Sequence, residues 1–101
     1  MWLIAMFDLP VDTPQARKEY THFRKALLRE GFTMLQYSVY GRFFQSAEDS
    51  DVHRKHVRAV LPPDGQVRLV TITDKQFAKM EVFEGPIRGK AEPPPAQMML
   101  F

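Results

Sequence analysis

The sequence predicts an α+β domain with the element order β-α-β-β-α-β, the ferredoxin-like split βαβ arrangement. Three observations predict it. A short apolar run opens the chain, two segments have the apolar spacing of amphipathic helices, and the stretches after them are rich in aromatic and β-branched residues. With 101 residues, 45% of them hydrophobic, the chain is expected to form one domain with its own core.

The first predicted strand is the apolar run from Trp2 to Phe7, which leads into Asp8 and ends at Pro10. A short, nearly all-apolar run is typical of a strand buried on both faces, and so of the middle of a sheet. Asp8 is then a charge at the carboxyl end of a buried strand, where an unpaired carboxylate is costly. Either Asp8 accepts hydrogen bonds as a local cap, or it binds a cation.

The first predicted helix spans about residues 14–30. Thr13 is a suitable N-cap, a proline occupies the first helical position, apolar residues recur with 4-3-4 spacing, and Gly31 is a suitable C-cap. Arg17 and Lys18 fall in the first turn, where cations oppose the helix dipole. A bound anion would offset that cost.

The stretch from Phe32 to Phe44 is predicted as two strands divided near Gln36–Ser38, with Gly41 allowing a bulge or a close backbone approach. Its aromatic side chains lie beside Arg42 in sequence and could stack on nucleotide bases. We favour core and dimer packing for them, because strands use such residues anyway.

The rest of the predicted domain is a helix that begins at Ser46, a strand at Gln66–Thr73, a short helical turn at Lys75–Met80 and a brief strand at Glu81–Glu84. The Gln66–Thr73 strand is apolar in part on both faces. We therefore expect it to lie next to the first strand, with both at the centre of the sheet.

Residues 1–84 are thus expected to form the ferredoxin-like domain. Residues 85–101 form a Pro- and Gly-rich linker followed by the apolar end Met98–Phe101. We expect this end to dock as an extra strand on the sheet edge of this subunit or of a partner.

The formal net charge is only +2, but residues 13–44 contain six Lys or Arg residues against two acids, a local excess of +4. Such a field is typical of a polyanion-binding surface, and equally of a solvated helix face. The absence of cysteine excludes disulfides and thiolate metal sites and fits a cytoplasmic protein. No apolar run is long enough to span a membrane, and no signal peptide is evident.

Two metal sites can be considered from the residues alone. His53 and His56 are three apart on a predicted helix and could meet one metal, but no third ligand lies nearby in sequence, and surface or partly buried histidines are the ordinary interpretation. Asp8 alone is also a poor site. Two chains meeting about a twofold axis would supply two Asp8 carboxylates, which could hold a cation that supports phosphodiester cleavage.

Four segments together resemble the CRISPR-associated protein two family, the small subunit of the spacer-acquisition machinery. They are LIAMFDLPVDT, ALLREGFTMLQYSVYGRFF, LPPDGQVRLVTITDKQF and KMEVFEG. The resemblance covers about residues 2–85 and is closest to members from type II systems, whose tails the ending QMMLF also resembles. The segment Gly85–Ala96 departs from the family pattern, and the resemblance implies no role for it.

The resemblance implies a ferredoxin-like homodimer whose C-terminal strand crosses to the partner's sheet. It implies a divalent metal, Mg²⁺ or Mn²⁺, held by Asp8, and some members are described as metal-dependent endonucleases on RNA or double-stranded DNA. It also implies that the dimer bridges dimers of a larger integrase and supports a DNA duplex. Arg17 and Lys18 are the nearest equivalents of the family's DNA-contacting residues. Position and charge add Arg24 and Arg42.

Three hypotheses remain open on these grounds. The chain could be a metal-dependent nuclease that uses Asp8, or a DNA-binding assembly subunit whose catalytic power resides in the integrase. The third alternative is a ferredoxin-like RNA- or ligand-binding module without nuclease activity. We favour the assembly role in the cell, with cleavage as an activity that the chain either retains or has lost.

Overall fold

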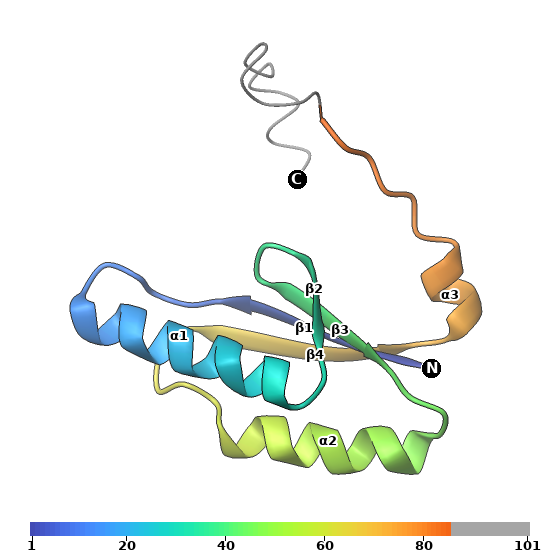
Figure 1. The fold of residues 1–101 in the computed structure, drawn as a ribbon, viewed down its shortest axis with the longest axis horizontal. Helices are drawn as coiled ribbons and strands as arrows, with labels where there is room; N and C mark the ends of the chain where they lie inside the picture. The colour runs from blue at the N-terminus through green and yellow to red at the C-terminus, as the bar shows by residue number, and fades with distance from the viewer. Residues whose placement is uncertain (86–101) are drawn as a thin grey trace.

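The computed structural model describes residues 1–85, which form one sheet with two long helices on the same face (Figure 1). The expectations for the Pro-rich linker and for the tail Met98–Phe101 lie outside the described residues. No helix in the described part of the chain has the length and apolar character needed to cross a membrane.

The sheet is antiparallel throughout, with the strand order β2-β3-β1-β4. Its strands are β1 (Trp2–Asp8), β2 (Thr33–Gln36), β3 (Val39–Phe43) and β4 (Gln66–Ile72). With helices between β1 and β2 and between β3 and β4, this is the ferredoxin-like arrangement. The predicted fold class and the central position of the first strand are therefore confirmed.

The fourth strand corrects one prediction. β4 pairs with β1 over seven residues, as expected, but it lies at the edge of the described sheet and not at its centre. Val67 and Leu69 pack against the core, whereas Val70 points to the opposite face and is 39% exposed. Apolar residues on both faces of this strand therefore do not mean that the described chain covers both faces.

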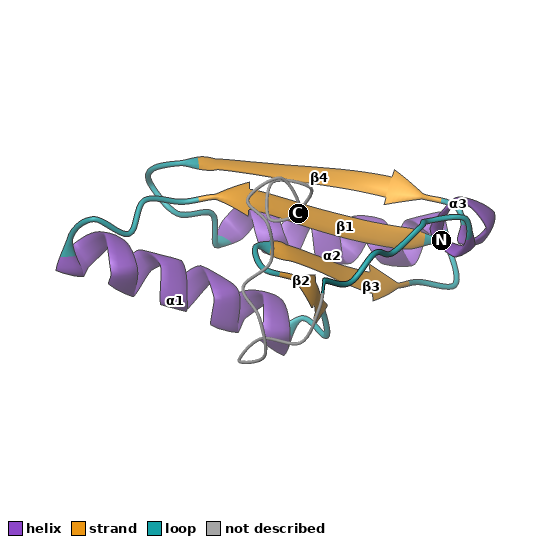
Figure 2. Cartoon of the chain, turned by 90° about the horizontal axis from the view of Figure 1, so that it is seen from above, coloured by secondary structure: helices purple, strands orange, loops and turns teal. Residues whose placement is uncertain are grey.

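Local signals place the helices. α1 (Pro14–Arg29) begins where the Thr13 hydroxyl accepts a hydrogen bond from the Ala16 N–H at 3.0 Å, and Gly31 follows its end with φ +85°. α2 (Ala47–Ala59) begins in the same way at Ser46, whose hydroxyl accepts from the Asp49 N–H at 3.1 Å. Both helices lie on one face of the sheet (Figure 2).

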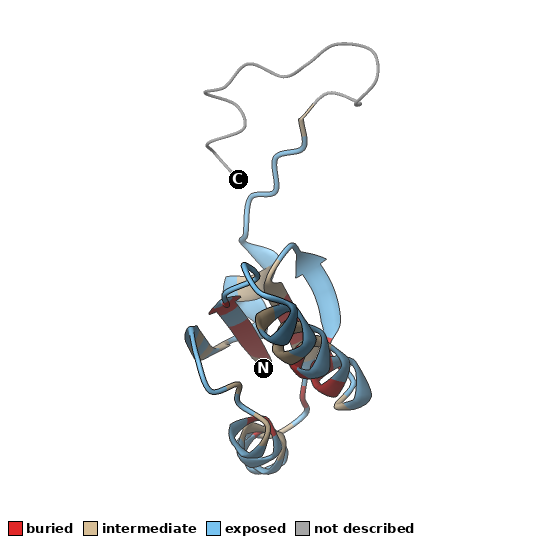
Figure 3. Ribbon diagram, turned by 90° about the vertical axis from the view of Figure 1, so that its left-hand side faces the viewer, coloured by how far each residue is buried: buried red, intermediate tan, exposed pale blue. Residues whose placement is uncertain are grey.

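The core lies between this face and the helices, where the buried residues gather (Figure 3). Alternate side chains of β1 enter it, because successive residues of a strand point to opposite faces. The buried members of this cluster are Leu3, Ala5, Phe7, Leu9, Phe23, Leu27, Phe32, Tyr40, Phe44 and Val57.

The other face of the sheet, called here the open face, carries no helix of comparable length in the described part of the chain (Figures 1 and 2). It nevertheless presents apolar side chains, with Met6 36% exposed and Phe43 47% exposed. Ile4 is buried on this face, where Gly41 leaves room for its side chain and for that of Leu35. A Cβ at position 41 would lie 2.9 Å from Leu35 Cδ1 and 3.0 Å from Ile4 Cδ1.

The chain leaves the sheet through α3 (Asp74–Ala78), the predicted short helical turn. The Phe77 ring stacks on Trp2 at 3.8 Å between ring centroids. The predicted strand at Glu81–Glu84 is wrong, because this segment pairs with no other strand of the described chain. Its apolar residues Val82 and Phe83 are instead 78% and 64% exposed.

Candidate metal and nucleic-acid sites

Asp8 is the last residue of β1 and lies opposite Gln66 in the antiparallel register with β4. Alternation along β1 sends Phe7 into the core and Asp8 to the open face, where its side chain is exposed. The expectation of a charge held against an apolar interior is therefore wrong. Asp8 avoids the cost of burial, and within residues 1–85 its carboxylate accepts no hydrogen bond as a local cap.

The surroundings of Asp8 are shallow and polar on one side. Asp8, Gln66 and Arg68 border a cavity of about 190 Å³ together with two residues of β1. Arg68 Nη1 donates to Gln66 Oε1 at 3.2 Å, so a cation stands close to the Asp8 position. Sequence reasoning missed Gln66 and Arg68, although the antiparallel pairing of the first and fourth strands would have brought them there.

Gly65 packs closely against the backbone of Asp8. This glycine has φ +90°, and a Cβ on it would lie 2.6 Å from the Asp8 carbonyl oxygen. Only a glycine therefore allows the loop before β4 to approach this closely, and that approach fixes the end of β1.

Asp8 does not form a complete metal site by itself. Within residues 1–85 it belongs to no group of three His, Asp or Glu side chains close enough to share an ion. Mg²⁺ and Mn²⁺ favour carboxylate oxygens and accept water or phosphate for the remaining positions, so the ligand type fits but the number does not. A metal held at Asp8 would need further ligands beyond the side chains that lie close to it in residues 1–85.

A separate basic surface runs along the first half of α1. An open hollow of about 450 Å³ is lined there by Pro14, Arg17, Lys18, Thr21, His22 and Lys25. Arg17 Nη1 donates to the Val11 carbonyl at 3.1 Å, which holds the guanidinium over the start of the helix. The first turn contains no acidic residue, and within residues 1–85 neither Arg17 nor Lys18 forms a salt bridge.

The other two predicted nucleic-acid contacts differ from each other. Arg24 lies two helical turns beyond Arg17 on α1 and is half-buried. Arg42 points into the helix layer, where its Nη1 donates to the Glu30 carbonyl and its guanidinium lies 4.7 Å from the Phe44 ring centroid. These contacts favour a structural role for Arg42, and the structure does not bring it together with Arg17 and Lys18.

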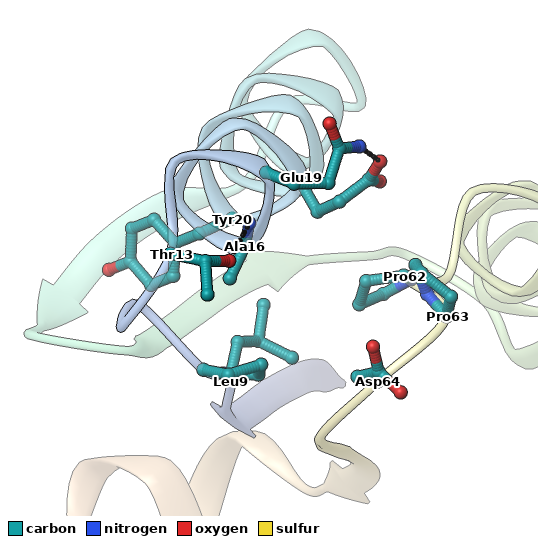
Figure 4. Close-up of a pocket in the computed structure, with 10 residues that line it drawn as sticks. Leu9, Thr13, Ala16, Glu19, Tyr20, Pro62, Pro63 and Asp64 are labelled. Carbon is teal, nitrogen blue, oxygen red and sulfur yellow. Dashed lines mark hydrogen bonds between the residues drawn. The ribbon is translucent and has the colours of Figure 1, made fainter.

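A small cavity of about 120 Å³ lies between the start of α1 and the loop before β4 (Figure 4). Leu9, Ala16, Pro62 and Pro63 give it a mostly apolar lining. Pockets that enclose small ligands usually measure about 300–1,000 Å³, so this cavity is too small to serve as a substrate site.

Sequence comparison places the chain in a family. Residues 1–80 match the family described as "CRISPR associated protein Cas2". The chain is 54% identical over 101 residues to the "CRISPR-associated endoribonuclease Cas2" of Parvibaculum lavamentivorans, with all of both chains covered. It is 44% identical to the protein of the same description from Flavobacterium psychrophilum, covering all of this chain and 88% of that one. The chain belongs to the Cas2 family.

A solved structure supports the fold. The crystal structure of Streptococcus pyogenes Cas2 at pH 6.5 superposes with a TM-score of 0.62 at 19% sequence identity, covering 83% of this chain and 100% of that chain. At this identity the similarity concerns the fold alone, and it agrees with the ferredoxin-like arrangement described above.

Proposed function

We propose that this chain is a cytoplasmic subunit of the CRISPR spacer-acquisition machinery that binds double-stranded protospacer DNA as a homodimer and bridges dimers of the larger integrase. The observation that carries the proposal is the basic surface of α1, on which Arg17 and Lys18 lack acidic partners within residues 1–85. Membership of the Cas2 family supports it.

The helix itself favours an anionic ligand at this surface. Arg17 stands in the first turn of α1 and Lys18 directly follows it, near the positive end of the helix dipole, and that arrangement is unfavourable until an anion neutralises it. Lys25 lies two helical turns further on, about 11 Å along the axis, so the surface can follow successive phosphates of a duplex.

Charge reversal tests this surface. The double variant Arg17→Glu/Lys18→Glu should bind a DNA duplex more weakly, and the slope of log affinity against log salt should fall by about 0.9 for each phosphate that the protein no longer neutralises. Lys55→Glu/Arg58→Glu is the matched control, since it makes the same charge change at exposed positions of α2. Unchanged affinity in the first variant, or an equal loss in the control, would count against the proposal.

The open face is the proposed dimer contact. It exposes Met6, Phe43 and Val70 to solvent, and a second copy would bury them and bring a second Asp8 to the same side of the assembly. Val70→Asp should therefore raise the dimer dissociation constant in sedimentation velocity. Val52→Asp, which changes an exposed valine on α2, should leave it unchanged.

Association with the integrase separates this proposal from a free-standing RNA- or ligand-binding module. A co-purified or mixed integrase should form a stable complex with the chain in size-exclusion chromatography. A chain that binds nucleic acid but never enters such a complex would favour the module.

Metal-dependent phosphodiester cleavage is the second candidate function, and it rests on the exposed position of Asp8 at the end of β1. The relatives' printed description as endoribonucleases favours the same activity. A Mg²⁺ or Mn²⁺ ion between two Asp8 carboxylates would supply an activated water and offset phosphate charge. The chain's own contribution is to hold Asp8 in place through the close contact with Gly65.

The test of cleavage compares two aspartates near the end of β1. Asp8→Asn should reduce cleavage of labelled RNA or DNA to background in Mg²⁺ or Mn²⁺ while the dimer stays intact. Asp64→Asn, an exposed residue of the loop before β4, should cleave at the wild-type rate. Cleavage that survives in Asp8→Asn would exclude Asp8 as the metal ligand and leave the DNA-binding role untouched.

A further inference from the structure

The fold brings a carboxylate next to two histidines that lie far from it in sequence. Glu30 follows the last residue of α1, whereas His53 stands in the middle of α2 and His56 in its last turn. Glu30 Oε2 lies 2.6 Å from His53 Nδ1 and 3.1 Å from His56 Nδ1, and the three ligand atoms are all within 4.8 Å of one another. This cluster is unrelated to Asp8, which belongs to the open face of the sheet.

The geometry of α2 presents both imidazoles to the same carboxylate. Residues three apart on a helix lie on one side of it, and the two rings are 5.6 Å apart between centroids. The histidine spacing alone supplies two ligands. Glu30 is the third ligand that the sequence did not place, because 23 residues separate it from His53.

We propose that Glu30, His53 and His56 bind a divalent cation of the zinc class and thereby join the end of α1 to the second half of α2. Two imidazoles and one carboxylate are a donor set that suits zinc, with water in the fourth position of a tetrahedral site. Imidazole ligands disfavour Mg²⁺ and Ca²⁺, so this site differs in metal preference from an all-carboxylate pair of Asp8 side chains.

The side-chain environment defines how the ion enters. Glu30 and His53 are 24% and 20% exposed, whereas His56 is 53% exposed, so the cluster is open to solvent on the His56 side. Burial acts to raise the pKa of Glu30, but hydrogen bonds from His53 and His56 outweigh it and hold the pKa below its ordinary value.

On the inner side of the cluster, a bound cation would lie close to the positive charge of Arg42. Its Nη1 lies 3.1 Å from His53 Nδ1, and it is held there by the Glu30 carbonyl and the Phe44 ring. Because Arg42 weakens cation binding at this point, we expect zinc to bind reversibly and to act as a brace on a fold that forms without it.

The experiment uses the full chain without an affinity tag, stripped of metal with a chelator, and titrated with zinc against a chromophoric competitor. The wild type should bind one zinc per chain at the cluster. His56→Ala and Glu30→Gln should each lower the affinity by more than about 100-fold, beyond the 10–100-fold that loss of an outer supporting group costs. Cobalt in place of zinc should give the visible absorption of a tetrahedral site in the wild type and not in His56→Ala or Glu30→Gln.

Two controls make the result specific. His22→Ala removes an exposed histidine from α1 outside the cluster and should leave zinc affinity unchanged, as should Asp8→Asn. Circular dichroism of each variant without metal should match the wild type, because His56 is exposed and Glu30→Gln keeps the side-chain volume. Failure of the wild type to bind zinc, or equal binding by His56→Ala and Glu30→Gln, would overturn the proposal.

Discussion

The two faces of the sheet differ in whether the described chain covers their apolar side chains and gathers a set of metal-ligating residues. On the helix face, β1 packs Leu3 and Phe7 into a closed core, and the layer above it gathers Glu30, His53 and His56 from two helices into one cluster. On the open face, β1 ends in an exposed Asp8 that belongs to no group of three metal-ligating side chains within residues 1–85, beside apolar side chains that the described chain leaves in water. The helix face is covered within the described chain, whereas the open face is not.

The largest expected effect tests this contrast by truncating one phenylalanine on each face. Phe23→Ala empties a fully buried site under α1 and should lower the free energy of unfolding by about 3–5 kcal/mol. Phe43→Ala removes a ring that is 47% exposed on the open face and should cost less than about 1.5 kcal/mol in the dilute monomer. Urea denaturation measures both.

The concentration dependence of these two costs sharpens the comparison. If a second copy covers the open face, the cost of Phe43→Ala rises with protein concentration while that of Phe23→Ala stays constant. If the two variants lose the same free energy of unfolding at every protein concentration, the two faces do not differ in whether a second copy covers them.

A smaller effect comes from two glycines with positive φ, one on each side of the molecule. Gly31→Ala should lose about 1–2 kcal/mol of stability, because the residue has φ +85° and its new Cβ would meet the Arg42 side chain but no backbone atom. Gly65→Ala should lose more, since its Cβ would meet the Asp8 carbonyl in addition to the strain of φ +90°.

The functional consequences of the two glycine variants should separate. Gly65→Ala should impair cleavage that depends on Asp8 and leave zinc binding intact. Gly31→Ala should change zinc affinity and leave that cleavage intact. Metal titrations and cleavage assays on both variants provide the measurement. A variant that alters both properties equally would show that the two sites are coupled through the sheet.

The smallest effect concerns the helix caps. Thr13→Ala removes the hydroxyl that accepts from Ala16 N–H and should cost about 1 kcal/mol, as should Ser46→Ala at the start of α2. Only Thr13→Ala loosens the turn that carries Arg17 and Lys18, so only this variant should also weaken DNA binding. Thermal unfolding measures the stability of both variants, and filter binding measures their DNA affinity. Equal DNA affinity in the two variants would show that DNA binding by the basic surface does not depend on an ordered first turn.

The sequence allowed prediction of features whose signals are local. Thr13, Ser46 and Gly31 mark helix ends by chemistry that acts over three or four residues, and the apolar run before Asp8 predicts the central strand. The edge position of β4 was not predictable from its pattern, since its open face carries apolar residues that this chain leaves exposed.

The candidate sites also divide into features with a local sequence signal and features that depend on the fold. Asp8 stands out in sequence as a charge at the end of an almost wholly apolar strand, although its exposure follows from the alternation of β1 and not from the composition of that strand. The contacts of Glu30 with His53, and of Arg42 with both, depend on how two helices pack on a sheet. Residue spacing does not predict contacts between elements so far apart in sequence, so these contacts become visible only in the fold.

The chain contains a single tryptophan, and that residue is Trp2. It lies on the open face, stacked on Phe77 and edge-on to Phe43 at 5.9 Å between ring centroids. Its intrinsic fluorescence therefore reports on that surface alone, without background from the core. Dimer assembly, or the arrival of any other partner on this face, can be followed in unlabelled protein as a change in the emission of one indole.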